Sequence, residues 1–224
     1  MTVSSDNRDR RPRHGLHALE KVDLAPREES FLRDSIAHAA GDPTWKRRKL
    51  REAHDLFALA QIAPRRLSVQ MLDPRDDLRA IVTLRAPVPC LEDPQGELQI
   101  ADEATLGLTY PRAILSGPLP GYAVVQVLAP LDVWHANVGR TPSPQSLCLA
   151  AKLPQGTRLP QIIVLAYAAL SMQIVMVDEG DAAGVLNADA ARWWQRNLAL
   201  APLTREPFLS EEVLDRSTAE EVAP

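Results

Sequence analysis

The chain has few cysteines, few glycines and few aromatic residues. Among 224 residues there are 2 cysteines and 10 glycines, and aromatic residues make up 4%. Two cysteines are too few for a disulfide framework or for a zinc site of their own. Scarce glycine disfavours the loops that cradle phosphate groups, and scarce aromatic residues disfavour a surface on which nucleic-acid bases stack.

An excess of positive charge and an apolar leader are also missing. With 25 basic and 29 acidic side chains the net charge is −4, which argues against nucleic acid as the main partner. Residues 1–15 contain no apolar core, so we expect no secretory signal and a cytoplasmic protein with reduced thiols. The charge-free stretch 159–177 contains proline, glutamine and serine, and a buried helix explains it better than a membrane span.

The composition that is present is typical of a globular domain with stiff turns. Hydrophobic residues make up 46%, charged residues 24%, and there are 19 prolines. Charge and apolar content change along the chain, which predicts a mobile arm over residues 1–27, one domain over 28–200 and an acidic tail over 201–224.

Periodicity and turn signals predict an α+β fold. Residues 28–60 have a helical pattern with a break at 41–43, and the apolar stretch 161–172 and residues 188–197 predict two later helices. Between them lie four expected strands, at 67–71, 79–84, 97–100 or 105–108, and 122–127. Because short turns join them, we expect an antiparallel meander, followed by a proline-rich irregular stretch over 130–160.

The residues that point to chemistry follow the meander. His135-Ala136-Asn137 lies shortly before Cys148, which stands between two leucines. Pro160 then opens the apolar helix, and an acidic loop occupies 178–181. Asn187 begins the last helix, which carries the paired alanines Ala190 and Ala191.

This ordered series resembles the ubiquitin-conjugating (UBC-like) enzymes, over about residues 28–197. That family has a His-Pro-Asn motif, an active cysteine in an apolar setting, a helix that opens at a proline, and a last helix that opens at an asparagine. In this chain Ala136 replaces the middle proline, and residues 141–144 lengthen the gap before Cys148. The similarity is greatest to the bacterial branch associated with antiphage conjugation operons.

The resemblance implies a fold, an activity and partners. The fold would be UBC-like: an N-terminal helix, a four-stranded meander, a cysteine loop and two C-terminal helices. The activity would be to accept a ubiquitin-like protein from an activating enzyme as a thioester on Cys148 and to pass it to an amine of a target protein. No cofactor, metal, nucleic acid or membrane would take part.

The same resemblance assigns roles to five residues. Cys148 would carry the thioester, and Asn137 would donate its amide to the oxyanion or order the loop near the cysteine. His135 would be mainly structural, bonding backbone groups of its own loop. Asp178 or Asp181 would orient the incoming amine, whose ordinary pKa is about 10.4.

Each of these residues also has an interpretation without catalysis. Cys148 is also explained as a small buried apolar residue, Asn137 as a turn residue, and both aspartates as solvated loop residues. Two other functions therefore stay open: a non-catalytic module that binds a ubiquitin-like protein, and a cysteine hydrolase that pairs Cys148 with His135. Cys90 has no comparable motif and is expected to be structural.

A basic run lies in the second half of the first helical region. It consists of Lys46, Arg47, Arg48, Lys49 and, after one leucine, Arg51. The run is explained either as a solvated helix face or as a docking surface for an acidic protein partner, and by analogy with the family we expect it to dock the activating enzyme.

Overall fold

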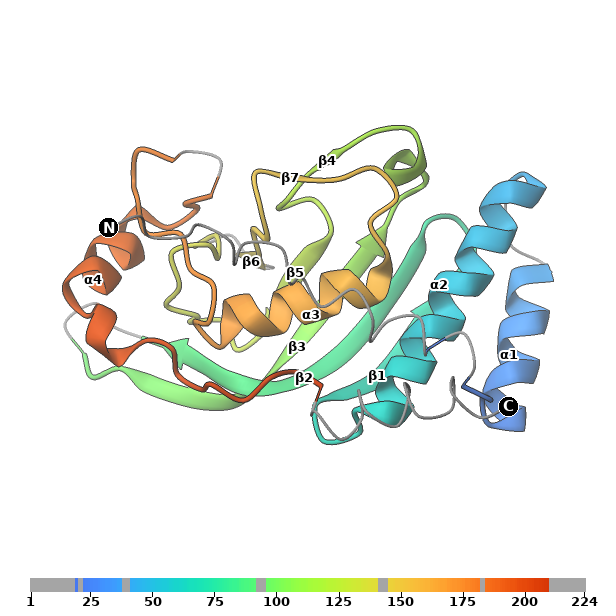
Figure 1. Ribbon diagram of the computed structural model, residues 1–224, viewed down its shortest axis with the longest axis horizontal. Coiled ribbons are helices and arrows are strands. Elements are labelled where there is room, and N and C mark those ends of the chain that lie inside the picture. Colours follow the sequence, from blue (N-terminus) through green and yellow to red (C-terminus); the bar gives the residue numbers. More distant parts are fainter. Residues whose placement is uncertain are drawn as a thin grey trace, which may run out of the picture.

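Two helices, a curved antiparallel sheet and two further helices follow one another along the chain in the computed structural model (Figure 1). The structure describes residue 19 and residues 22–37, 41–91, 96–140, 145–181 and 184–209. Helices α1 and α2 lie at one end of the sheet, α4 lies at the other end, and α3 crosses one face between them (Figure 1). The predicted α+β class is confirmed.

The first helical region forms two helices, α1 (Pro26–Ala37) and α2 (Pro43–Ile62). The carboxylate of Asp42 caps α2, because its Oδ1 accepts the backbone N–H of Thr44 at 2.9 Å and of Trp45 at 3.0 Å. Pro43 occupies the first turn, where a missing N–H costs nothing, and Pro64 follows the end of the helix.

The main sheet has the strand order β1-β2-β3-β5-β6, and every neighbouring pair is antiparallel. Its members are β1 (Leu67–Asp73), β2 (Leu78–Cys90), β3 (Gln99–Tyr110), β5 (Val125–Ala129) and β6 (Gln145–Ser146). Of the two alternatives for a third strand, 105–108 lies inside the single long strand β3, and 97–100 overlaps its beginning at Gln99. The fourth expected strand begins later than predicted, at Val125.

A second, two-stranded sheet joins the β3–β5 connection to the segment before α3. After the 3-10 turn η2 (Arg112–Leu115), β4 (Leu119–Pro120) pairs with β7 (Lys152–Leu153). This small sheet holds two parts of the chain that flank Cys148 in space, as described below.

The last helices are α3 (Leu159–Leu170) and α4 (Ala188–Arg196), followed by the 3-10 turn η3 (Leu198–Leu200). Pro160 lies in the first turn of α3, as the sequence predicts. The side chain of Asn187 caps α4 by accepting the N–H of Ala190 at 3.1 Å.

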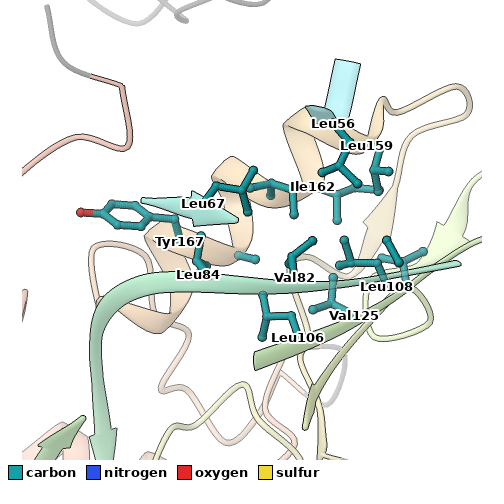
Figure 2. Packing of buried hydrophobic residues seen from close by; sticks show 14 of the residues in the cluster. Leu56, Leu67, Val82, Leu84, Leu106, Leu108, Val125, Leu159, Ile162 and Tyr167 are labelled. Carbon is teal, nitrogen blue, oxygen red and sulfur yellow. The ribbon is translucent and has the colours of Figure 1, made fainter. Parts of the chain in front are cut away.

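The core lies between α3 and the sheet, and α2 closes one end of it. Figure 2 shows side chains from these elements meeting in one layer, among them Leu56 of α2, Leu67, Val82, Leu84, Leu106, Leu108 and Val125 of the sheet, and Leu159, Ile162 and Tyr167 of α3. Each of the ten is at most 2% exposed, so burial of this apolar layer stabilises the fold.

A buried group of charges, which we call the ion cluster, fixes α2 against the start of α3. It consists of Arg48, Glu52 and Asp55 of α2 and Arg158, which precedes α3. Arg48 Nε lies 2.8 Å from Glu52 Oε1, and Arg158 pairs with Asp55. Glu52 also accepts the first N–H of α3, and burial raises its pKa while that bond and Arg48 lower it.

The described residues beyond 200 belong to the domain. Phe208 is buried against Tyr167, with ring centroids 5.4 Å apart, and Arg66 pairs with Glu206. The boundary predicted at residue 200 therefore falls too early. On the N-terminal side α1 begins at Pro26, inside the predicted arm, whereas residues 1–18, 20–21 and 210–224 lie outside the described residues.

Candidate active site around Cys148

Backbone hydrogen bonds pair the His135–Gly139 turn with the chain around Cys148. The N–H of Cys148 donates to the carbonyl of Asn137 at 2.7 Å, and the N–H of Gly139 donates to Ser146 at 2.8 Å. Val138 and Leu147 form an antiparallel bridge between these two segments. The structure thus brings the asparagine and the cysteine side by side, although eleven positions separate them; residues 141–144 of that interval lie outside the described residues.

His135 is fully buried, and both of its ring nitrogens are bonded to backbone groups. Nδ1 accepts the N–H of Asn137 at 3.0 Å, so Nε2 carries the proton and donates to the carbonyl of Ala169 at 2.9 Å. Burial lowers the pKa of His135 to about 4, and the bond to Ala169 opposes this. The ring is neutral at pH 7 and joins its own turn to the last turn of α3.

The side chain of Asn137 is committed to the loop after α3. Its Nδ2 donates to Gly184 at 2.6 Å and to Met176 at 3.1 Å, and its Oδ1 accepts the N–H of Met176 at 3.0 Å. The amide therefore orders the loop next to the cysteine. Of the two roles expected for Asn137, these contacts match loop ordering.

The acidic loop lies beside the same turn. Asp178 accepts the N–H of Gly180 at 2.9 Å, and the N–H of Asp181 donates back to the carbonyl of Asp178 at 3.0 Å, so the loop turns tightly here. Asp181 is close enough for its charge to act on the pKa of Cys148, whereas Asp178 is exposed at the outside of the turn. Of the two aspartates, Asp181 is the one placed toward the cysteine.

Cys148 is covered in this structure. It is 4% exposed, and its Sγ donates to the carbonyl of Ala150 at 3.3 Å. Burial raises the pKa of the Cys148 thiol, a backbone hydrogen bond with Ala150 lowers it, and Asp181 raises it again. Cys90 is also buried, and burial raises its pKa to about 11. Both thiols are therefore protonated at pH 7.

The basic run on α2 divides into an outer and an inner part. Arg47 is exposed and Lys46 half-buried. Lys49 is fully buried, and its Nζ donates to the carbonyls of Pro74 at 2.7 Å and Asp76 at 2.9 Å. The expectation that Lys49 docks a partner is corrected, because this side chain instead closes the β1–β2 turn.

Arg48 is held in the same way as Lys49. Its guanidinium donates to Tyr110 Oη at 2.7 Å and to the carbonyl of Gly156 at 2.8 Å, in addition to its pair with Glu52. A structural role replaces the predicted docking role for Arg48 as well. Lys46, Arg47 and Arg51 are the members of the run that a partner can reach.

Comparisons with family models, with curated proteins and with solved structures found no match for this chain. Among the described residues, no helix is both long enough and apolar enough to cross a membrane. Nor do any three histidine, cysteine or acidic side chains in that part of the chain group together as metal ligands.

The sequence analysis missed two features. One is the ion cluster, whose signal was present: Glu52 and Asp55 occupy the apolar stripe of α2 beside Leu56 and Leu59. Charged residues at such positions indicate a buried ion pair. The other is the close approach of Gly121 to Ala150 beside Cys148, which no local pattern in the sequence marks.

Proposed function

We propose that the chain accepts a ubiquitin-like protein from an activating enzyme as a thioester on Cys148 and transfers it to an amine of a target protein. The observation that carries the proposal is the convergence of three segments on one thiol. Hydrogen bonds join the turn at His135–Asn137 to residues 146–148 and to Gly184, and the charge of Asp181, in the same loop as Gly184, acts on the thiol. Their chain order is the one that resembles the UBC-like enzymes.

The chemistry needs no oxidant or cofactor. In the first step the Cys148 sulfur, having lost its proton, attacks the carbonyl carbon of the donor thioester. A new carbon–sulfur bond forms, the old one breaks, and the thiol of the activating enzyme is restored. In the second step an amine attacks the Cys148 thioester, an amide forms, and the amine proton compensates the released thiolate.

The neighbouring groups suit the second step better than the first. Burial is the main cause of the raised pKa of Cys148, and the negative charge of Asp181 adds to it by disfavouring a free thiolate. Once Cys148 carries a thioester it has no charge to repel, and the same carboxylate then attracts a protonated lysine and takes one proton from it, so that the neutral amine can attack. The second proton, which the nitrogen loses as the amide forms, goes to the released thiolate. Asp181 is thus proposed to act on the acceptor, and Asn137 to hold the loop that presents it.

A charging assay tests the proposal. The protein is mixed with a bacterial ubiquitin-like protein, its activating enzyme and ATP, and the products are separated without reductant. We expect a thiol-sensitive adduct that Cys148→Ala abolishes and Cys90→Ala retains. Both cysteines are buried, but only Cys148 lies beside the turn that carries His135 and Asn137. An adduct that survives in Cys148→Ala contradicts the proposal, as does no adduct when the activating enzyme itself is charged.

The second candidate is a non-catalytic module that binds a ubiquitin-like protein. The observation in its favour is the 4% exposure of Cys148, which suits an inert core thiol. This candidate predicts that Cys148→Ala binds a ubiquitin-like protein as tightly as the unaltered chain does, with no adduct in either case. Isothermal titration and the charging assay together separate the two functions.

The geometry does not favour a cysteine hydrolase. Such an enzyme needs an imidazole that takes the proton of the thiol. Both ring nitrogens of His135 are bonded to backbone groups, and burial lowers its pKa to about 4.

The sequence resemblance to the bacterial branch of the family further suggests a role in antiphage defence, which a plaque assay with Cys148→Ala would test.

A further inference from the structure

A short stretch of backbone folds back over the thiol of Cys148. We call residues 149–151 the cover segment. The carbonyl of Ala150 accepts the thiol proton at 3.3 Å, while Ala150 itself faces solvent. The carbonyl that bonds the sulfur thus belongs to an exposed residue, whereas Cys148 itself is 4% exposed.

The cover segment is bonded to Gly121, in the segment between β4 and β5. The N–H of Leu149 donates to the carbonyl of Gly121 at 3.3 Å, and β4 pairs with β7 immediately beyond. The bond from Leu149 is long for a backbone hydrogen bond, and only two residues of each strand pair in the small sheet. The attachment is therefore short, and few bonds must break for the cover segment to move.

Gly121 is the residue that lets the cover segment come so close. A methyl group placed on its Cα would overlap the Ala150 carbonyl oxygen and would lie 2.7 Å from the carbonyl carbon and nitrogen of Ala150. Gly121 is not among the described residues with a positive φ, so its backbone suits an alanine. The need for glycine here comes from the neighbouring backbone alone.

We infer that Gly121 is a positioning residue for Cys148: it seats the Ala150 carbonyl over the thiol, and the cover segment must lift for the sulfur to react. The inference rests on the proposed function in naming what the lifted segment would admit, an incoming thioester. In the seated state the thiol is hydrogen-bonded and shielded, so the protein that carries no thioester would resist reaction with unrelated electrophiles. Docking of the donor would supply the energy that lifts the cover segment.

The test measures thiol reactivity and needs neither modifier nor activating enzyme. In a Cys90→Ala background, which leaves one cysteine, the rate of reaction with 5,5′-dithiobis(2-nitrobenzoate) is compared for Gly121→Ala and Gly117→Ala. Gly117 is the matched control, because a methyl group placed there has no atom within 4 Å. We expect Gly121→Ala to react about tenfold faster than the control, because local opening is made easier.

A pH profile distinguishes positioning from a general loosening of the fold. Burial is the main cause of the raised pKa of Cys148, so lifting the cover segment should move the midpoint of alkylation by iodoacetamide to lower pH. Gly117→Ala should leave the midpoint unchanged. Equal rates and equal midpoints for the two variants overturn the inference.

A second variant covers the case in which Gly121→Ala does not fold. Ala150→Gly adds no atom and loosens the cover segment, and we expect about a threefold faster reaction than for Ala199→Gly, a control at an exposed alanine of η3. An unchanged rate there overturns the inference. If the thiol rates change as expected but no charging occurs with a ubiquitin-like protein, the proposed function fails and the positioning role stands.

Discussion

The ion cluster and the turn around His135 both join segments that are far apart in the chain, but they use different groups. Arg158 and Asp55 are separated by 103 positions and pair as full charges. His135 and Asn137 reach across 34 to 47 positions with neutral side chains that bond backbone groups. Removing one charge of a buried pair leaves the other uncompensated, whereas a broken neutral bond can be replaced by water. The difference indicates a fixed support under α3 and a rearrangeable site around Cys148.

The largest effect should come from breaking the ion cluster. Arg158→Met leaves the carboxylate of Asp55 buried without its main partner, and we expect a loss of about 3–5 kcal/mol in the free energy of unfolding. Urea denaturation measures this loss. The control is Arg33→Met, whose pair with Glu29 is 75% and 62% exposed and should cost under about 1 kcal/mol. Equal costs for the two variants would remove the distinction between a fixed support and a surface pair.

A smaller effect is expected at Asn137. Asn137→Ala removes the three hydrogen bonds that the side-chain amide makes with the backbone of Met176 and Gly184. We expect a loss of about 2–3 kcal/mol in the free energy of unfolding. The loop after α3 should also become a preferred site of limited proteolysis. Asn197→Ala, which removes a single bond to the carbonyl of Trp193, should cost under about 1 kcal/mol. Unaltered proteolysis of the loop would contradict the ordering role.

His135 should give the neutral site a pH dependence. Because its pKa is lowered from 6.5 to about 4, the unfolded chain takes up a proton that the folded chain does not, and stability falls as the pH drops through that window. Below pH 4, where the loss is complete, the free energy of unfolding is lower by about 3 kcal/mol. Glutamine does not titrate, so His135→Gln should be about 1–2 kcal/mol less stable than the unaltered chain at pH 7.5, with a smaller gap at pH 5.

Urea denaturation of both proteins between pH 5 and pH 7.5 measures that gap. Taking the difference at each pH cancels the contribution of Glu52, whose raised pKa has the opposite sign. A gap that stays constant across the range would show that the His135 ring does not titrate differently in the folded and unfolded chains.

The smallest effect on stability is expected on the outer face of α2. Arg47→Glu should change the free energy of unfolding by less than about 0.5 kcal/mol. If Arg47 docks the activating enzyme, charging of Cys148 should slow about threefold at low salt and recover as salt is raised. Arg79→Glu, an exposed charge reversal on β2, is the control. Equal charging rates for the two variants would discard the docking surface.

The fold class and most elements were predictable because local rules decide them. Asp42 and Asn187 cap helices where capping residues are expected, and Pro160 opens α3. The position of the third strand was left between two alternatives, because polar residues such as Asp102 and Glu103 separate them; these residues lie on the exposed part of one continuous strand. Alternating polarity alone does not distinguish the end of a strand from its solvent face.

The site was less predictable because distant backbone groups decide it. The run of basic residues indicates a solvated face, yet Lys49 is buried. Its Nζ donates to carbonyls of the β1–β2 turn, which lie 25 and 27 positions further along the chain. The motif places Asn137 near Cys148, but the partners of its amide lie 39 and 47 positions away. Which backbone groups a polar side chain meets depends on the packing of the whole domain.

The contacts of residues 206–208 have a consequence for the order in which the domain folds. Arg66 and Glu206 are 140 positions apart, and Phe208 completes the layer over Tyr167. Contacts of such sequence separation form late in folding, because the cost of closing a long loop comes before the gain from the contact. Closure of this layer is therefore a late step in folding.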